Sequence, residues 1–267
     1  MPGMPRSEVV PFVLALVQMR VDPGDREANL RRALARIDSA ARDGADVVLL
    51  PEALPLGWMD ASTRDLADAV PDGATCRAFR AAARDAGVFV CVGLAERSGD
   101  HVFNAAVLID PQGDVLLHHR KINELGIARG MYARGDRLGV AETPWGRVGL
   151  MICADAFAGG EVVSRTLALM GADVILSPCA WAVPPDHDNT REPYGDLWRS
   201  SYGTVARDFG IWIAGASNVG HITSGPWTGH RCIGNSLVVG PDGAPVLEAP
   251  YGDDADVVRL LPVEGRP

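Results

Sequence analysis

Apolar runs of strand length alternate with helical segments along most of this chain, and this alternation constrains the fold more than any other feature. Residues 46–50 form a continuous apolar run that ends at Pro51, which is typical of a strand buried on both faces. Residues 74–86 predict a helix that ends at Gly87. The same patterns predict further strands at residues 12–17, 88–94, 148–152, 173–176 and 211–216, and further helices at residues 30–41, 162–170 and 197–209. The alternation therefore predicts an α/β protein with its helices outside the sheets.

Two segments predict hairpins instead. Residues 102–109 and 115–119 flank the turn sequence DPQGD, and residues 232–239 and 244–247 flank the turn sequence PDG. No linker, repeat or low-complexity stretch divides the 267 residues, and 47% of them are hydrophobic, which supplies enough apolar material for one large core. We therefore expect a single domain over the whole chain, with residues 1–10 as a loose tail.

The charge balance excludes several classes of partner. Lys and Arg number 25 against 34 Asp and Glu, whereas surfaces that bind nucleic acid or anionic membranes need clustered positive charge. Aromatic residues make up only 6% of the chain, which is too few for a base-stacking platform. No apolar run approaches the ~20 residues of a membrane span, and no phosphate-binding Gly-rich loop follows a predicted strand. We expect a cytoplasmic protein that binds neither nucleic acid nor membrane.

Cysteine usage points to free thiols. A chain of this length does not need disulfides, so each thiol is either core filler or chemically active. The six histidines match no common zinc-ligand spacing, and we expect no metal site. The five cysteines are spread along the chain without a CxxC pair: Cys76, Cys91, Cys153, Cys179 and Cys232.

Reactive side chains directly follow several predicted strands. Glu52, Lys121 and Cys153 each come just after one, and in α/β folds ligands lie beyond the carboxyl ends of the strands. Together their chemistry is complementary. A carboxylate accepts a thiol proton as general base, and an ammonium both favours the thiolate and stabilises an oxyanion. Cys179 also follows a strand, but its neighbour Pro178 supplies no backbone N–H, so Cys153 is the better candidate nucleophile.

Taken one at a time, each of these residues has an ordinary structural explanation. Glu52 is typical of a surface or helix-capping carboxylate, Lys121 of a solvated lysine, and Cys153 of a small buried hydrophobic residue. Spacing alone does not show that the three strands are neighbours. At the level of single residues, the catalytic and the structural interpretations both stay open.

Four sequence segments around these residues resemble the nitrilase (carbon–nitrogen hydrolase) superfamily. In chain order they are residues 44–52 (GADVVLLPE), 119–121 (HRK), 149–155 (GLMICAD) and 234–243 (GNSLVVGPDG). Their order and distances match those of the family, and the resemblance spans nearly the whole chain. It implies a four-layer α-β-β-α sandwich and a hydrolase with a Glu-Lys-Cys triad that uses no metal or organic cofactor.

The resemblance also implies roles for individual residues. Cys153 attacks the carbonyl or nitrile carbon, and Glu52 takes up and returns the protons. Lys121, together with the backbone N–H of Ala154, holds the developing oxyanion. Many family members carry a second glutamate that positions the substrate. The stretch where it is expected holds no acid here, and Glu124 is the nearest candidate.

Two departures from the family's patterns bear on the reaction. Ala154 and Asp155 follow the cysteine, where true nitrilases usually have Trp-Glu, and Ala156 and Phe157 stand where carbamoylases often have an Arg. These departures favour an amidase that hydrolyses a small linear amide through a cysteine thioester. The alternatives are an N-carbamoyl amidohydrolase or a nitrilase on the same triad, or a non-catalytic binding protein on this scaffold. The family's usual assembly also implies a homodimer or a higher homo-oligomer.

The segment from residue 179 to residue 198 is long and irregular, and it follows the strand after the one that carries Cys153. Long irregular loops in compact domains tend to be functional, so we expect this loop to border the pocket. Trp181 is the candidate for an apolar wall. The candidates for binding a polar part of the substrate are Asp186, His187, Asn189, Arg191, Glu192 and Tyr194. A solvated loop or a dimer contact is the alternative.

Overall fold

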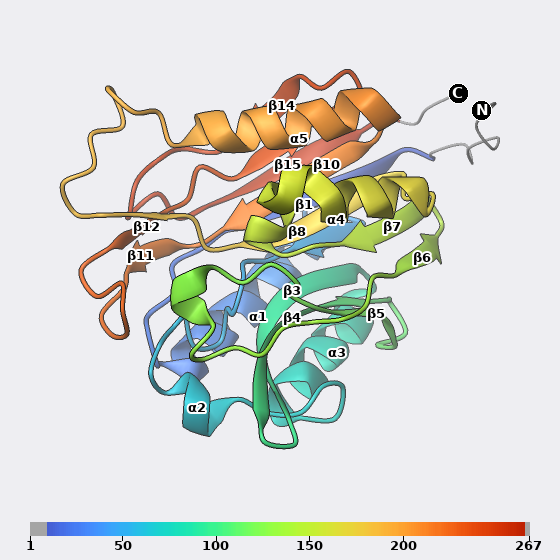
Figure 1. The fold of residues 1–267 in the computed structure, drawn as a ribbon. Coiled ribbons are helices and arrows are strands. Elements are labelled where there is room, and N and C mark those ends of the chain that lie inside the picture. The colour runs from blue at the N-terminus through green and yellow to red at the C-terminus, as the bar shows by residue number, and fades with distance from the viewer. Residues whose placement is uncertain (1–9, 265–267) are drawn as a thin grey trace.

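A computed structural model describes residues 10–264 and arranges them in four layers (Figure 1). Two six-stranded sheets lie face to face, and a pair of helices covers the outer face of each. This is the α-β-β-α order that the family resemblance implies. The predicted loose tail at residues 1–10 lies outside the described residues, apart from Val10.

The first sheet buries both of its faces. Along strand β1 (Phe12–Gln18), which is second from one edge of this sheet, Leu14 and Leu16 face the second sheet, whereas Ala15 and Val17 face the helices. Those helices are α1 (Arg26–Arg42) and α3 (Ala74–Ala86). In sheet order, the strands are β15 (Val257–Val263), β1, β2 (Val47–Leu49), β3 (Phe89–Ser98), β4 (His101–Ile109) and β5 (Val115–Arg120).

The second sheet packs its inner face against the first sheet and its outer face against α4 (Ala158–Leu169) and α5 (Gly195–Phe209). Strands β7, β8 and β10 run parallel, so their carboxyl ends share one edge. In sheet order, the strands are β14 (Pro245–Glu248), β13 (Leu237–Val239), β10 (Trp212–Ser217), β8 (Val174–Cys179), β7 (Gly146–Leu150) and β6 (Val140–Thr143).

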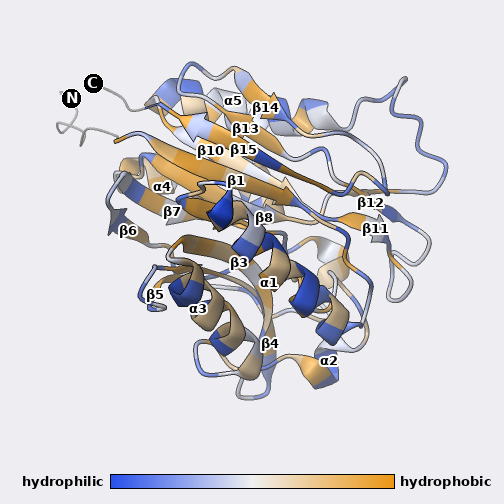
Figure 2. Cartoon of the chain, turned by 180° about the vertical axis from the view of Figure 1, so that it is seen from behind, coloured by the Kyte–Doolittle hydropathy of each residue, from blue (hydrophilic) through white to orange (hydrophobic). Residues whose placement is uncertain are grey.

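Local sequence signals fix the helix ends. The side chain of Asp25 accepts a hydrogen bond from the N–H of Ala28 at the start of α1, and α3 ends at Gly87 in the left-handed conformation. The helix predicted at residues 74–86 and the hairpin of β4 and β5 are confirmed. Figure 2 shows the hydrophobic colours concentrated on the strands, while α1 and α3 carry hydrophilic residues on their outer side.

The hairpin predicted around the turn PDG is confirmed for β13 and β14, which pair antiparallel, but its first strand, predicted at residues 232–239, is not continuous, because the structure divides it between two sheets. Its first part is β12 (Arg231–Ile233), which pairs with β11 (Val219–His221) and β9 (Ala182–Val183) in a small third sheet, and its second part is β13. The backbone turns at Gly234 and Asn235, whose φ angles are +62° and +59°. A Cβ on Gly234 would lie 2.2 Å from the side chain of Gln18, so this crossing requires glycine.

Periodicity did not predict β15, which covers one edge of the first sheet by pairing antiparallel with β1. Without it, β1 would present an open edge of unpaired backbone groups. Three short helical segments complete the described chain: α2 (Thr63–Leu66) and the 3-10 helices η1 (Gly126–Ala128) and η2 (Cys153–Ala156).

Candidate active site

The carboxyl ends of strands from both sheets meet at one cavity. Glu52 lies three residues after β2, Lys121 directly follows β5, and Cys153 lies three residues after β7 at the start of η2. All three side chains line a cavity of about 190 Å³, which we call the Cys153 cavity. The structure therefore brings together the three residues that the sequence singles out.

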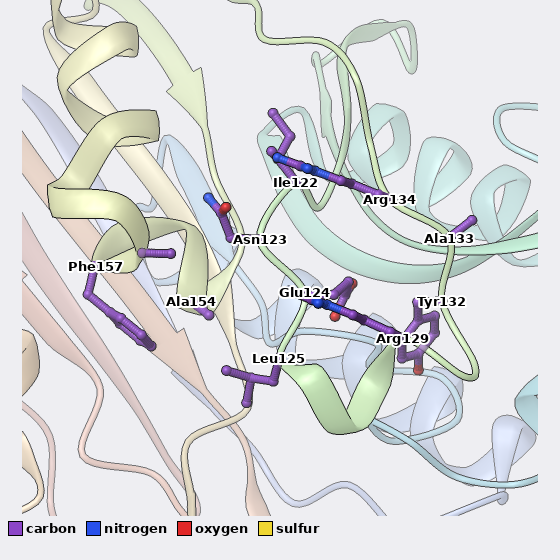
Figure 3. A pocket seen from close by; sticks show the side chains of 11 residues that line it. Ile122, Asn123, Glu124, Leu125, Arg129, Tyr132, Ala133, Arg134, Ala154 and Phe157 are labelled. Carbon is purple, nitrogen blue, oxygen red and sulfur yellow. The ribbon is translucent and has the colours of Figure 1, made fainter.

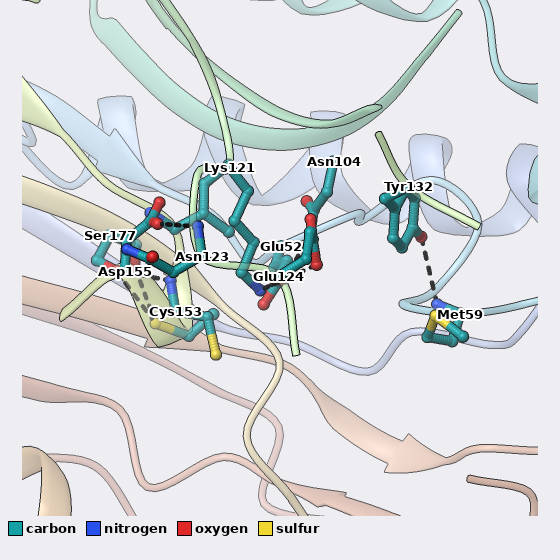
Figure 4. A network of polar contacts seen from close by, with 12 residues as sticks. Glu52, Met59, Asn104, Lys121, Asn123, Glu124, Tyr132, Cys153, Asp155 and Ser177 are labelled. Carbon is teal, nitrogen blue, oxygen red and sulfur yellow. Dashed lines mark hydrogen bonds and ion pairs between the residues drawn. The ribbon is translucent and has the colours of Figure 1, made fainter. Parts of the chain in front are cut away.

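Glu52 and Lys121 form a buried ion pair. The Lys121 Nζ donates to Glu52 Oε1 at 2.7 Å, and each side chain is only 1% exposed. The Nδ2 of Asn104, on β4, donates to the same oxygen at 2.6 Å (Figure 4). A Cβ on Gly93 of β3 would lie 2.5 Å from the Cα of Glu52, so the turn that carries Glu52 packs directly on that strand. These contacts fix the carboxylate in one position.

Glu124 is the second carboxylate beside the lysine. Its Oε2 lies 3.9 Å from Lys121 Nζ. Burial raises the pKa of Glu124 to about 7; the negative charges of Glu52 and Asp155 act in the same direction, and Lys121 opposes them. The carboxyl group therefore changes charge close to neutral pH.

Replacing Glu124 by glutamine is expected to change how stability depends on pH. An acid with a raised pKa in the folded state holds more protons folded than unfolded, so the wild type loses stability as pH rises from 4.5 to about 7. This loss amounts to about 3 kcal/mol, and the Glu124→Gln variant should lack it. Urea unfolding at about pH 5 and about pH 8 measures the difference. Glu264→Gln, at an exposed position, is the control, and an unchanged pH dependence in Glu124→Gln would contradict the prediction.

Cys153 stands on a strained turn between β7 and η2. Its φ is +45°, in a region that non-glycine residues rarely adopt, and its backbone N–H donates to the Ser177 Oγ at 3.2 Å. The neighbouring Cys179 sulfur, burial and the charge of Glu52 raise the pKa of the Cys153 thiol well above its usual value, while Lys121 lowers it. The thiol is therefore protonated at rest. At this thiol the charge of Glu52 opposes the charge of Lys121.

Asp155 connects the nucleophile turn to the lysine loop. Its Oδ1 accepts hydrogen bonds from the backbone N–H groups of Asn123 at 2.8 Å and Ile122 at 3.2 Å. Its Oδ2 accepts a hydrogen bond from the backbone N–H of Ile152 at 3.1 Å. The His119 Nε2 lies 2.9 Å from Oδ2, and hydrogen bonding to His119 lowers the pKa of Asp155 against the effect of burial. The carboxylate thus ties the loop after β5 to the turn after β7.

Asp155→Asn is expected to destabilise the protein by roughly 3–5 kcal/mol, because an amide nitrogen would face backbone donors that the carboxylate now satisfies. Turnover of any substrate should fall with it, since Lys121 and Cys153 would lose their common anchor. Urea unfolding at neutral pH measures the stability. Asp136→Asn, with a side chain that is 77% exposed, should leave stability unchanged. Wild-type stability in Asp155→Asn would contradict this role.

The loop after β8 contributes less to the cavity than the sequence predicts. Tyr194 lines the Cys153 cavity. Trp181 is fully buried behind it and stacks on Trp198 of α5, with ring centroids 4.4 Å apart. The other five candidates lie on the loop but do not line this cavity: Asp186, His187, Asn189, Arg191 and Glu192. The Oδ1 of Asn189 instead accepts a hydrogen bond from the backbone N–H of Tyr194 at 2.9 Å.

Sequence reasoning missed several residues of the site. Asn104 interrupts the apolar run of β4, and a lone buried amide in such a run is a signal that was available. Trp58 and Trp227 also line the Cys153 cavity, but they lie on loops that carry no local pattern. Their place in the cavity depends on how the chain folds over long range.

A second cavity of about 550 Å³ adjoins the first, and we call it the Arg134 cavity (Figure 3). The two cavities share Leu125, Ala154 and Phe157 as lining residues. Figure 3 shows Ala154 and Phe157 on one side of the Arg134 cavity and Arg134 on the other. The loop that carries Glu124 runs between them.

Within residues 10–264, no group of three or more His, Cys, Asp or Glu side chains is placed to hold a metal ion. No helix of the described chain combines the length and the apolar composition that crossing a bilayer requires. The five cysteines are all buried free thiols.

Known proteins with similar sequences identify the family. The sequence profile of the family Carbon-nitrogen hydrolase matches residues 13–258. A nitrilase from Pyrococcus abyssi (strain GE5 / Orsay) is 36% identical over 177 residues, which cover 64% of this chain and 66% of that protein. An (R)-stereoselective amidase from Pseudomonas sp. is 28% identical over 247 residues, which cover 92% of this chain and 84% of that protein.

Solved structures share the fold. Nit3 of Saccharomyces cerevisiae, a member of branch 10 of the nitrilase superfamily, matches with a TM-score of 0.81 at 20% identity and covers 97% of this chain and 93% of its own. An amidase from Nesterenkonia sp. matches with a TM-score of 0.79 at 24% identity, and the match covers 99% of this chain and 94% of that one. The predicted four-layer α/β fold is confirmed. Because the profile matches most of its length, the chain belongs to the carbon–nitrogen hydrolase family of the nitrilase superfamily.

Proposed function

We propose that this protein hydrolyses a small primary amide to a carboxylic acid and ammonia through a thioester on Cys153. The observation that carries the proposal is the cavity where Glu52, Lys121 and Cys153 meet. A thiol, a carboxylate and an ammonium in one buried site supply a nucleophile, a general base and an oxyanion partner.

In the first half of the reaction, the Glu52 carboxylate accepts the thiol proton while Cys153 Sγ bonds to the carbonyl carbon. The carbonyl oxygen becomes an oxyanion, which the Lys121 ammonium and the Ala154 N–H stabilise. Ala154 is suited to this role because the first N–H groups of a helix lack partners within it. When the carbonyl re-forms, the C–N bond breaks and Glu52 returns the proton, so that ammonia leaves.

In the second half, Glu52 takes a proton from water as the water oxygen attacks the thioester carbon. The C–S bond then breaks, the carboxylic acid leaves, and the sulfur takes back the proton. The raised pKa of Cys153 fits this scheme, because the thiol keeps its proton until Glu52 removes it during attack. No metal or organic cofactor is needed for any step.

Structures of a related amidase support an amide as substrate. A variant of the Nesterenkonia sp. AN1 amidase is known in complex with butyramide. It is 25% identical to this chain, and the match covers 97% of this chain. Another variant of that amidase carries the acetamide moiety of fluoroacetamide covalently on its active-site cysteine. That protein thus binds one amide and carries the acetamide moiety of another on its active-site cysteine.

The proposal is tested by ammonia release from a panel of primary amides, N-carbamoyl compounds and nitriles. We expect ammonia and a carboxylic acid from amides. Carbon dioxide alongside ammonia would show an N-carbamoyl amidohydrolase, and turnover of nitriles but not amides would show a nitrilase. Failure of every compound, together with an unreactive Cys153, would overturn the proposal in favour of a non-catalytic binding protein.

We also propose that the whole chain forms a single domain and assembles as a homodimer or a higher homo-oligomer. Supporting the assembly, the outer side of α4 exposes Leu169 (72%) and Val162 (50%), which is unusual for large apolar side chains. A cytoplasmic location remains a prediction.

A further inference from the structure

The Cys153 cavity has an apolar, aromatic lining. Its aromatic wall consists of five side chains from four separate parts of the sequence: Trp58, Phe157, Tyr194, Trp198 and Trp227. Leu125 and Leu197 add further apolar surface. Among the described residues, the charged side chains in the lining are Glu52 and Lys121, which already neutralise each other. Away from the reacting group, a bound molecule thus meets aromatic rings and aliphatic side chains.

The aromatic wall is held in place by ring contacts. Trp227 meets Trp58 edge-on, with centroids 4.9 Å apart, and stacks on His230 at 4.9 Å with an interplanar angle of 12°. On the other side, Trp198 meets Phe157 edge-on at 5.4 Å. Trp227 comes from a glycine-rich loop whose sequence suggested no function. The rings are therefore ordered before a ligand arrives, which lowers the entropic cost of binding.

Resting on the amidase function proposed above, we infer that the aromatic wall selects amides of uncharged apolar acids, with an aromatic or extended aliphatic acyl group. Aromatic rings offer an acyl group dispersion contacts and edge-to-face packing. An acyl group that ends in a carboxylate would be buried in the same cavity without a cation to pair with, which is costly. The arrangement therefore disfavours dicarboxylic acid monoamides and N-carbamoyl amino acids.

The Arg134 cavity provides the rival explanation. Arg129 and Arg134 line it, and it shares Leu125, Ala154 and Phe157 with the Cys153 cavity. A substrate long enough to span both cavities would place a carboxylate beside these guanidinium groups. The two explanations predict opposite preferences between a neutral amide and an acidic amide of the same length.

Binding to the Cys153→Ala variant distinguishes the two explanations in the absence of turnover. Calorimetry would compare 3-phenylpropanamide, hexanamide and glutaramate, the last matching hexanamide in length but ending in a carboxylate. We expect 3-phenylpropanamide to bind most tightly and glutaramate to bind at least about tenfold more weakly than hexanamide. Tighter binding of glutaramate would overturn the inference and assign selection to Arg129 and Arg134. Failure of all three to bind would overturn it as well.

Substitution of Trp227 tests the role of the aromatic wall in the active protein. This side chain is only partly buried, so its removal should leave the fold intact. Trp227→Ala should lower kcat/KM for 3-phenylpropanamide by about tenfold relative to acetamide, and Trp227→Phe should restore most of the loss. Trp212→Ala, a half-buried tryptophan on β10 outside this cavity, is the control. An equal loss on both amides would show a merely structural role and overturn the inference.

The inference and the proposed function fail differently. If the protein releases no ammonia from any amide but the Cys153→Ala variant shows the expected order of binding, the hydrolase proposal fails and the selective cavity stands. If amides are hydrolysed but glutaramate is preferred, the hydrolase proposal stands and the role of the aromatic wall fails.

Discussion

Replacement of Cys153 by alanine is expected to reduce amide hydrolysis by roughly 10⁴-fold or more, because removal of a nucleophile ends covalent catalysis. The thiol makes no stabilising ion pair, and alanine fits the turn, so the folded structure should persist. The measurement is ammonia release under saturating amide, together with mass spectrometry of the wild type for a transient acyl adduct on the peptide that contains residue 153.

The matched control is Cys76→Ala, a buried thiol on α3 that packs against the first sheet away from the cavity. It should keep wild-type turnover. Wild-type turnover in Cys153→Ala, with loss in Cys179→Ala, would contradict the assignment and move the nucleophile to the other buried thiol at the end of β8.

Lys121→Met is expected to affect both catalysis and stability. Loss of an oxyanion partner lowers kcat by about 10²–10³-fold. In addition, the Glu52 carboxylate would be left in the core without its cation, which costs roughly 3–5 kcal/mol of stability. Ammonia release measures the first effect, and urea unfolding at neutral pH measures the second.

The double variant Lys121→Met/Glu52→Gln separates the two effects. It removes both charges of the buried pair, so much of the lost stability should return, while activity should remain as low as in the single variant. A double variant that is no more stable than Lys121→Met would contradict the view that the unpaired carboxylate causes the loss. Recovery of activity together with stability would show that Lys121 acts only through the fold.

Local sequence patterns predicted most of the strands and helices because both sheets are buried on two faces. The sequence of a strand such as β2 is an uninterrupted apolar run, and the glycine at position 87 marks the end of α3. The strand at residues 232–239 could not be divided from the sequence, because the break at Gly234 depends on the side chain of Gln18, more than 200 residues away.

The three reactive residues were predictable because each follows a strand and each lies in a family segment. The rest of the site was not, because neighbours in space are set by the packing of the two sheets. Trp227 and Trp58 are 169 residues apart in the sequence, yet their rings touch. His187 and Arg191 lie on the same loop as Tyr194 but do not line the Cys153 cavity, and their role in binding stays a prediction.

The burial of Lys121 has a chemical consequence for the whole molecule. It is the only lysine in the chain, and the 24 other positively charged Lys or Arg residues are arginines. A reagent that couples to lysine ε-amines therefore has a single target, which lies inside the cavity and is ion-paired with Glu52. Labelling detected on the lysine ε-amine becomes a probe of this one cavity, and a lysine-specific isotope label gives a spectrum with one side-chain amine to assign.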